Sequence, residues 1–230
     1  MSQHELLRER TEQHKAKNVL SKNDDKEVYA AAKMVMDYLE KRFEMDSKYE
    51  NYHLEFAKSI KICDMVNFIR NKNITTEFYA YDETRIIYLV NEKENIKYPL
   101  VIAEVKHQGT NKEREKEGKE KQATGNAIER LGKNLTAIKT YMHYENITPF
   151  VCFGHGCDFT EDSLTVLSKV WCLNEFYDIN KIYVNKRDND REHGGFSPVS
   201  MYFREEKWNA EEMFDIMKEI AEYSFRYWLF

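Results

Sequence analysis

Apolar residues recur at helical spacing in five stretches of the chain, each with one apolar and one polar face. Between residues 27 and 43 the apolar positions are Val28, Ala31, Ala32, Val35, Met36 and Leu39. Between 124 and 145 they are Ile128, Leu131, Leu135, Ile138 and Met142. The spacing predicts helices over 27–43, 59–70, 124–145 and 161–175, and a last one beginning near Asn209, a residue type that suits a helix N-cap.

Stretches rich in β-branched and aromatic residues lie between these helices and predict strands. Their ranges are 75–81, 85–90, 98–105, 149–153, 182–185 and 199–203. The polar sequence NEKENIK joins the second and third of these strands, so we expect them to form a hairpin. Strands that alternate with helices predict an α/β fold, with one mixed central β-sheet flanked by α-helices on both sides.

Two segments lack apolar periodicity. Residues 1–26 are polar and predict an N-terminal arm, and residues 107–121 are almost all polar or charged and predict a surface loop. The remaining residues, 27–230, have the length and apolar content of one domain. Of all residues, 42% are hydrophobic, which is enough for a buried core and excludes a disordered chain.

The charge of the chain is acidic as a whole and basic in places. The formal net charge is -5, but residues 106–139 carry nine Lys or Arg against five Glu. Such a stretch is compatible with a DNA-facing surface and also with an ordinary solvated one. The N-terminus has no apolar signal core, and no run approaches the roughly 20 apolar residues of a membrane span, so we expect a cytoplasmic protein without membrane contact.

The sequence VIAEVK (101–106) carries the sharpest candidate chemistry. Glu104 and Lys106 are two residues apart on a predicted strand, so they project from one face, whereas Val101, Ala103 and Val105 face the other way. A carboxylate beside an ammonium suits phosphodiester hydrolysis, because the carboxylate can hold Mg²⁺ and the lysine can stabilise phosphate charge. The alternative is an exposed strand-end salt bridge, worth about 0–1 kcal/mol.

A Mg²⁺ site needs a second carboxylate. Asp82 and Glu83 precede the strand that pairs with 98–105 in the predicted hairpin. The start of one antiparallel strand lies beside the end of its neighbour, which would bring either side chain near Glu104. A plain turn, which Asp favours, explains the same residues.

The sequence TGNAIERLGKN (124–134) is a second motif. On a helix, Asn126, Glu129, Arg130 and Lys133 share one face. Asn pairs well with adenine, Arg with guanine, and Glu accepts from base amino groups. Gly125 at the helix start permits close backbone approach to DNA. A solvated helix face is the alternative.

Together, AEVKHQG (103–109) and GNAIER (125–130) with Lys133 and Asn134 resemble the catalytic strand and recognition helix of EcoRI-type restriction endonucleases, including the related MunI-type enzymes. RTEQHK (10–15) resembles an N-terminal stretch of the same family. The resemblance covers 103–155 well, the N-terminal arm partly and the C-terminal half weakly. It implies a PD-(D/E)xK nuclease core, with 27–230 combining catalysis and DNA recognition, that acts as a homodimer on double-stranded DNA.

The resemblance also implies residue roles. Asp82, Glu104 and Lys106 match the catalytic residues, and Asp82, Glu104 and the Val105 carbonyl match the ligands of Mg²⁺. This sequence has Tyr81 where the family has Pro before the catalytic Asp, which leaves Glu83 as a substitute for Asp82. The residues that match or flank the family's DNA-contacting segments are His107, Gln108, Gln122, Ala123, Gly125, Asn126, Ala127, Glu129, Arg130, Lys133 and Asn134.

The resemblance predicts a palindromic target centred on AATT, 5′-AATT overhangs, and a partner DNA methyltransferase that protects host DNA. Gln122 replaces a usual Met, and the family's downstream arginines fall loosely on Val166 and Lys169, so relaxed discrimination of the outer base pair is a hypothesis. Three alternatives remain open. They are another nuclease of the same superfamily, a DNA-binding protein with an inactive site, and an α/β protein in which the Glu-x-Lys pair is structural.

Overall fold

The computed structural model describes residues 3–58, 84–109, 115–118, 126–142, 145–159, 169, 181–183 and 199–230, with the side chains of 3–23, 84, 126–127, 139–140, 158, 181–183 and 199 left out. Within these ranges the helices are α1 (Gln3–Glu44), α4 (Asn126–Tyr141) and α6 (Ala210–Leu229), with short 3-10 turns at Ser47–Tyr49 and Cys157–Phe159. The strands are β1 (Tyr52–Ala57), β2 (Thr84–Asn91), β3 (Ile96–His107), β4 (Phe150–His155), β5 (Lys181–Tyr183) and β6 (Val199–Arg204).

The strands form one mixed sheet of six strands in the order β1-β2-β3-β4-β6-β5. β1, β2 and β3 are antiparallel neighbours, whereas β3, β4, β6 and β5 run parallel. This arrangement confirms the predicted hairpin between 85–90 and 98–105. It also brings the carboxyl ends of β3, β4 and β6 and the start of β2 to the same edge of the sheet.

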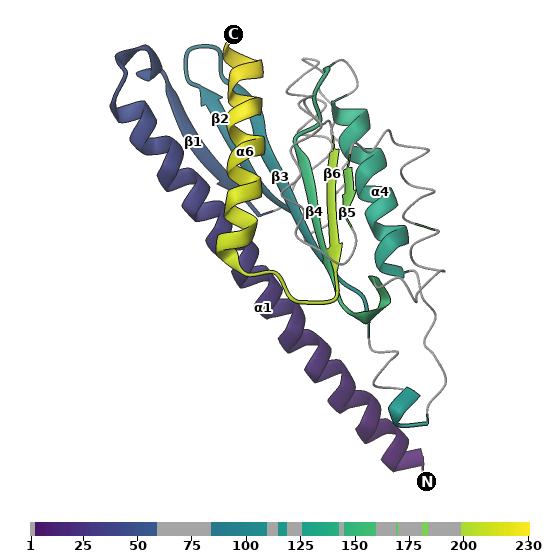
Figure 1. Cartoon of the computed structure of the whole chain (residues 1–230). Helices are drawn as coiled ribbons and strands as arrows, with labels where there is room; N and C mark the ends of the chain where they lie inside the picture. The colour runs from purple at the N-terminus through teal and green to yellow at the C-terminus, as the bar shows by residue number, and fades with distance from the viewer. Residues whose placement is uncertain are drawn as a thin grey trace.

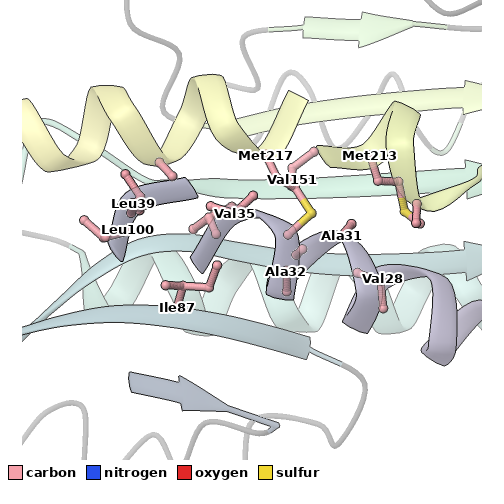
Figure 2. Packing of buried hydrophobic residues seen from close by; sticks show 14 of the residues in the cluster. Val28, Ala31, Ala32, Val35, Leu39, Ile87, Leu100, Val151, Met213 and Met217 are labelled. Atoms are coloured by element: carbon pink, nitrogen blue, oxygen red, sulfur yellow. The ribbon is translucent and has the colours of Figure 1, made fainter. Parts of the chain in front are cut away.

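Helices cover both faces of the sheet, as the sequence predicts (Figure 1). On one face α1 and α6 lie side by side, and Figure 2 shows Val28, Ala32 and Val35 of α1 among the residues packed there with Met213 and Met217 of α6. On the other face Ile128, Leu131, Leu135 and Ile138 of α4 pack on a second apolar cluster. The fold is therefore an α/β sandwich with a core on each side of the sheet.

Two elements differ from the prediction. The helix expected over 27–43 begins at Gln3, so the backbone of the predicted 1–26 arm continues the same helix. Its sequence contains neither Pro nor Gly and is rich in good helix formers, so an established helix propagates through it. The edge strand β1 was not predicted at all, although Tyr52, Leu54 and Phe56 alternate with polar residues.

The remaining predicted elements are confirmed where the structure describes them. α6 begins after Asn209, whose side chain accepts from the Glu212 backbone N–H in a reciprocal capping box. The predicted helix at 59–70 and strand at 75–81 lie outside the described residues, as does 161–175 apart from Lys169. No helix within the described ranges is long and apolar enough to cross a bilayer.

Candidate active site

β3 places the two residues of the Glu-x-Lys pair on the face of the sheet that α4 covers. Ile102, on the same side, belongs to the apolar cluster beneath α4, while Val101 and Ala103 belong to the cluster beneath α1 and α6. This alternation confirms the predicted assignment of faces. Glu104 and Lys106 therefore project into the layer between the sheet and α4, near the carboxyl end of β3.

Glu104 and Lys106 form a buried ion pair. Lys106 Nζ lies 2.5 Å from Glu104 Oε1, and the two side chains are 4% and 0% exposed. Burial of both groups separates this pair from the exposed strand-end salt bridge considered above. Enclosing two charges carries a large desolvation cost, which their attraction repays only when further hydrogen bonds complete the site.

One such hydrogen bond comes from α4. Asn134 Nδ2 donates to Glu104 Oε1 over 2.7 Å, across the interface between helix and sheet. Asn134 is 2% exposed, so its side chain is buried against β3 rather than turned to solvent. The family resemblance instead predicts that Asn134 contacts DNA.

The neighbouring strand β4 completes the edge of the site. In the parallel register Lys106 is opposite Gly154, and His107 is opposite His155. A Cβ on Gly154 would lie 2.2 Å from a ring atom of Phe203, so only glycine fits there without displacing that ring. The His107 and His155 rings are 4.8 Å apart, and Gln108 N donates to the His155 carbonyl.

The second carboxylate lies outside the described residues. Thr84, the first residue of β2, pairs with Glu104 in the antiparallel register. Asp82 and Glu83 immediately precede Thr84 in the sequence, but the description begins again only at Thr84. Within the part of the chain that is described, no group of three or more His, Cys, Asp or Glu side chains is arranged to hold a metal ion.

The solvent side of α4 carries the charged residues predicted to read bases. Glu129, Arg130 and Lys133 are all exposed, and Lys169 Nζ lies 3.5 Å from Glu129 Oε1. Asn126 and Ala127 are in the first turn of α4, but their side chains are not described. Gln122, Ala123 and Gly125 fall outside the described residues.

A polar cluster on the opposite face joins α1 to the same edge of the sheet. Asp24 Oδ2 lies 3.1 Å from His155 Nε2, and Asp24 Oδ1 lies 3.1 Å from Lys207 Nζ. Burial raises the pKa of the Asp24 carboxyl, but the hydrogen bonds and charges of His155 and Lys207 together outweigh burial and lower it. The cluster was not predicted, because no local pattern links residues 24, 155 and 207.

Comparisons with known proteins match the part of the chain that contains Glu104, Lys106 and Asn134. The family model for "Restriction endonuclease EcoRI" matches residues 14–169. Type II restriction enzyme RsrI of Cereibacter sphaeroides is 29% identical over 157 residues, which cover 55% of this chain and 56% of the relative. Type II restriction enzyme EcoRI of Escherichia coli is 26% identical over 158 residues, which cover 55% of this chain and 57% of that relative.

The chain therefore matches little more than half the length of these two relatives. The family match is broader with respect to this chain, since residues 14–169 include α1 from its fourth turn, the hairpin, α4 and β4. It contains Glu104, Lys106 and Asn134, and it spans more than half of the 230 residues. The chain belongs to the EcoRI family of restriction endonucleases.

Proposed function

We propose that this chain is a Mg²⁺-dependent type II restriction endonuclease that hydrolyses phosphodiester bonds in double-stranded DNA. The observation that carries the proposal is the buried Glu104–Lys106 pair at the end of β3, inside the region that matches the family. Burying such an ion pair has a large desolvation cost, so the pair is expected where its residues are needed for catalysis rather than for stability.

Oxygen donors near Glu104 fit Mg²⁺, which prefers carboxylate and carbonyl ligands. We assign the Glu104 carboxylate, the Val105 carbonyl and the Asp82 carboxylate as its ligands. Asp82 matches the family's catalytic Asp and Glu83 is its substitute. Both immediately precede Thr84, which is opposite Glu104 in the antiparallel register. When bound, Mg²⁺ lowers the pKa of coordinated water and neutralises charge on the phosphate.

The protein's own groups hold and orient the reactants. The Asn134 amide and the Lys106 ammonium both contact Glu104 Oε1, which fixes the carboxylate and compensates its buried charge. Once DNA binds, the Lys106 ammonium lies close enough to the metal ligand to orient the attacking water or to stabilise charge on a phosphate oxygen. Both roles need a fixed ammonium, and the 4% exposure of its side chain is consistent with such restraint.

We further propose that α4 reads the DNA. Its solvent side presents Glu129, Arg130 and Lys133, and Asn126 and Ala127 begin the helix. Gln122, Ala123 and Gly125 precede it, while His107 and Gln108 follow the catalytic strand. Arg, Asn and Glu are suited to base edges, and Lys is suited to phosphates.

The proposed target is a palindrome centred on AATT, cut to leave 5′-AATT overhangs by a homodimer whose two-fold symmetry matches that of the site. The proposal places the enzyme in the cytoplasm, paired with a DNA methyltransferase that protects host DNA. Relaxed discrimination of the outer base pair is part of the proposal, because Gln122 replaces the usual Met and the family's downstream arginines fall loosely on Val166 and Lys169.

Sequencing of cut ends tests this function. Purified protein is incubated with unmethylated genomic-size DNA, with and without Mg²⁺, and the new ends are sequenced. We expect discrete ends with 5′-AATT overhangs that require Mg²⁺ and several different outer base pairs. Cuts confined to GAATTC would contradict the relaxed outer discrimination alone. Binding of an AATT duplex without cutting would favour the inactive DNA-binding protein instead.

A further inference from the structure

Asn134 lies at the contact between α4 and the catalytic strand. It is on the same helix as Glu129, Arg130 and Lys133, but those three are exposed and Asn134 is 2% exposed. Its amide reaches Glu104, while the helix itself lies on the face of the sheet opposite α1 and α6 (Figure 1). One side chain thus connects the helix proposed to read DNA with the carboxylate proposed to hold the metal.

The chemistry of the contact fixes how the Asn134 amide is oriented. An ionised carboxylate only accepts hydrogen bonds, so the amide group that faces Glu104 must be the Nδ2 donor. The amide oxygen Oδ1 is attached to the same carbon and therefore lies in the immediate vicinity of Glu104. Oδ1 is buried and accepts no hydrogen bond from the part of the chain that the structure describes.

A buried amide oxygen without a donor among the described residues is unusual in a folded protein, and it leaves an acceptor for a water or ion at the site. Mg²⁺ retains several water molecules when it binds, and groups around a metal ligand usually orient it and its waters. Oδ1 is suited to accept a hydrogen bond from such a water, just as Nδ2 is suited to restrain the ligand.

We propose that Asn134 is a positioning residue for metal-dependent cleavage, which holds Glu104 through Nδ2 and accepts from a metal-bound water through Oδ1. This inference rests on the proposed function. It also gives α4 a second role, because a shift of the helix on DNA moves the donor that restrains Glu104. The rate of cleavage then depends on the position of α4 on the DNA, because the Asn134 side chain connects this helix to Glu104.

A double-mutant cycle tests the contact without any assay of activity. Asn134→Asp places a second carboxylate beside Glu104, and we expect it to lower Tm by about 4 °C or more. In the Glu104→Gln background the same change restores a donor–acceptor pair with the roles exchanged, so we expect less than half that loss. Equal losses in both backgrounds would overturn the inference.

A comparison of two buried substitutions on α4 tests the functional role. Asn134→Leu keeps the size of the side chain and removes both amide groups, whereas Ile138→Ala, one turn further along, weakens packing of the same helix. At a temperature well below both Tm values, we expect Asn134→Leu to slow single-turnover cleavage by about 10- to 100-fold. Its DNA Kd without metal should stay within about threefold of wild type. Ile138→Ala should leave both quantities within about threefold.

Calcium titration of the protein–DNA complex by calorimetry supplies a third result. We expect Asn134→Leu to weaken Ca²⁺ binding by about tenfold and Ile138→Ala to leave it unchanged. If wild type cuts DNA and Asn134→Leu cuts equally fast, this inference fails and the proposed function stands. If wild type binds Ca²⁺ but does not cut, the proposed function and the role of Asn134 in cleavage both fail, and the calcium titration and mutant cycle then show only whether Asn134 restrains Glu104. If wild type neither cuts nor binds Ca²⁺, both fail.

Discussion

Glu104 and Lys106 are charged residues in a layer whose other described residues are mostly apolar. Ile102 precedes them on the same face of β3, and Leu131 and Leu135 of α4 lie in the same cluster. Removing one partner of a buried ion pair typically costs about 3–5 kcal/mol, whereas replacing both with neutral groups of similar size is often neutral or stabilising. The pair therefore limits stability at this position, which is expected of a functional site.

A neutral replacement of the pair should preserve or increase stability and abolish activity. In Glu104→Gln/Lys106→Met the glutamine carbonyl still accepts from Asn134, so the Asn134 donor keeps its partner. We expect the free energy of unfolding, measured with urea, to equal the wild-type value or exceed it by about 1 kcal/mol.

The single variant Lys106→Met is the control for this prediction. It leaves the Glu104 carboxylate buried without its ammonium partner, and we expect a loss of about 3–5 kcal/mol. If the double variant is destabilised as much as this single variant, the pair is structural and the functional interpretation of its burial is wrong.

The sequence predicted this residue pair because apolar residues precede it on the same strand. Glu-x-Lys occurs three times in the chain, at 104, 117 and 205, but only the first ends an apolar run. The burial of Asn134 was not predicted. It lies three residues after Leu131 and four before Ile138, which is the edge of the apolar stripe of the helix, so a signal was available. The family motif instead predicts that Asn134 contacts DNA.

At the scale of the elements, α1 is attached to the sheet by both apolar and polar contacts. Val28, Ala32 and Val35 pack on the sheet as Figure 2 shows. Polar contacts also hold α1 at the edge of the sheet where β3 and β4 end. Asp24 contacts His155 and Lys207 there, and Asp25 Oδ1 lies 3.0 Å from Arg85 Nη2. The path of α1 relative to the active site is therefore set at residues 24 and 25.

The Asp24 cluster makes stability depend on pH in the acid range. The pKa of Asp24 is below its ordinary value of 3.8 in the folded protein, so the unfolded chain binds its proton first as pH falls. Its contribution is thus fully present above about pH 5 and is lost as pH falls through the folded pKa. We expect Asp24→Asn to cost about 1–3 kcal/mol at neutral pH and progressively less below 3.8.

Urea unfolding across pH 2–7 measures this dependence, with Asp37→Asn as the matched control. Asp37 is exposed on the same helix, and its substitution should have little effect at any pH. A difference between wild type and Asp24→Asn that stays constant down to pH 2 would contradict the stabilising role of the charged Asp24.

Element prediction succeeded where an apolar face defines the element and failed where it does not. The helices at 124–145 and after Asn209 and the strands around Glu104 have such a face and were found. The sequence of the first half of α1 has no apolar periodicity, so the prediction covered only part of the helix. β1 is a short edge strand that pairs with β2, and its Tyr52, Leu54 and Phe56 pack against the core.

At the scale of the whole molecule, residues beyond the family match complete the fold. β6 pairs with β4, and α6 packs with α1 over one face of the sheet, although both follow residue 169. Trp208, between them, donates from Nε1 to the carbonyl of Gly154, which is opposite Lys106. The C-terminal segment thus contacts β4, the strand that pairs with β3, a long-range relation that no local sequence pattern reveals.

The most direct measurement is single-turnover cleavage of a duplex containing GAATTC, compared between wild type and Glu104→Gln, with DNA Kd determined in parallel without metal. The account predicts Mg²⁺-dependent cleavage by wild type. It predicts cleavage by Glu104→Gln that is slower by about a thousandfold, as expected when several kcal/mol of transition-state stabilisation is lost, with a Kd within a few-fold of wild type. Equal cleavage rates, or a wild type that binds the duplex and leaves it intact, would contradict the assignment of Glu104 to the active site of a restriction endonuclease.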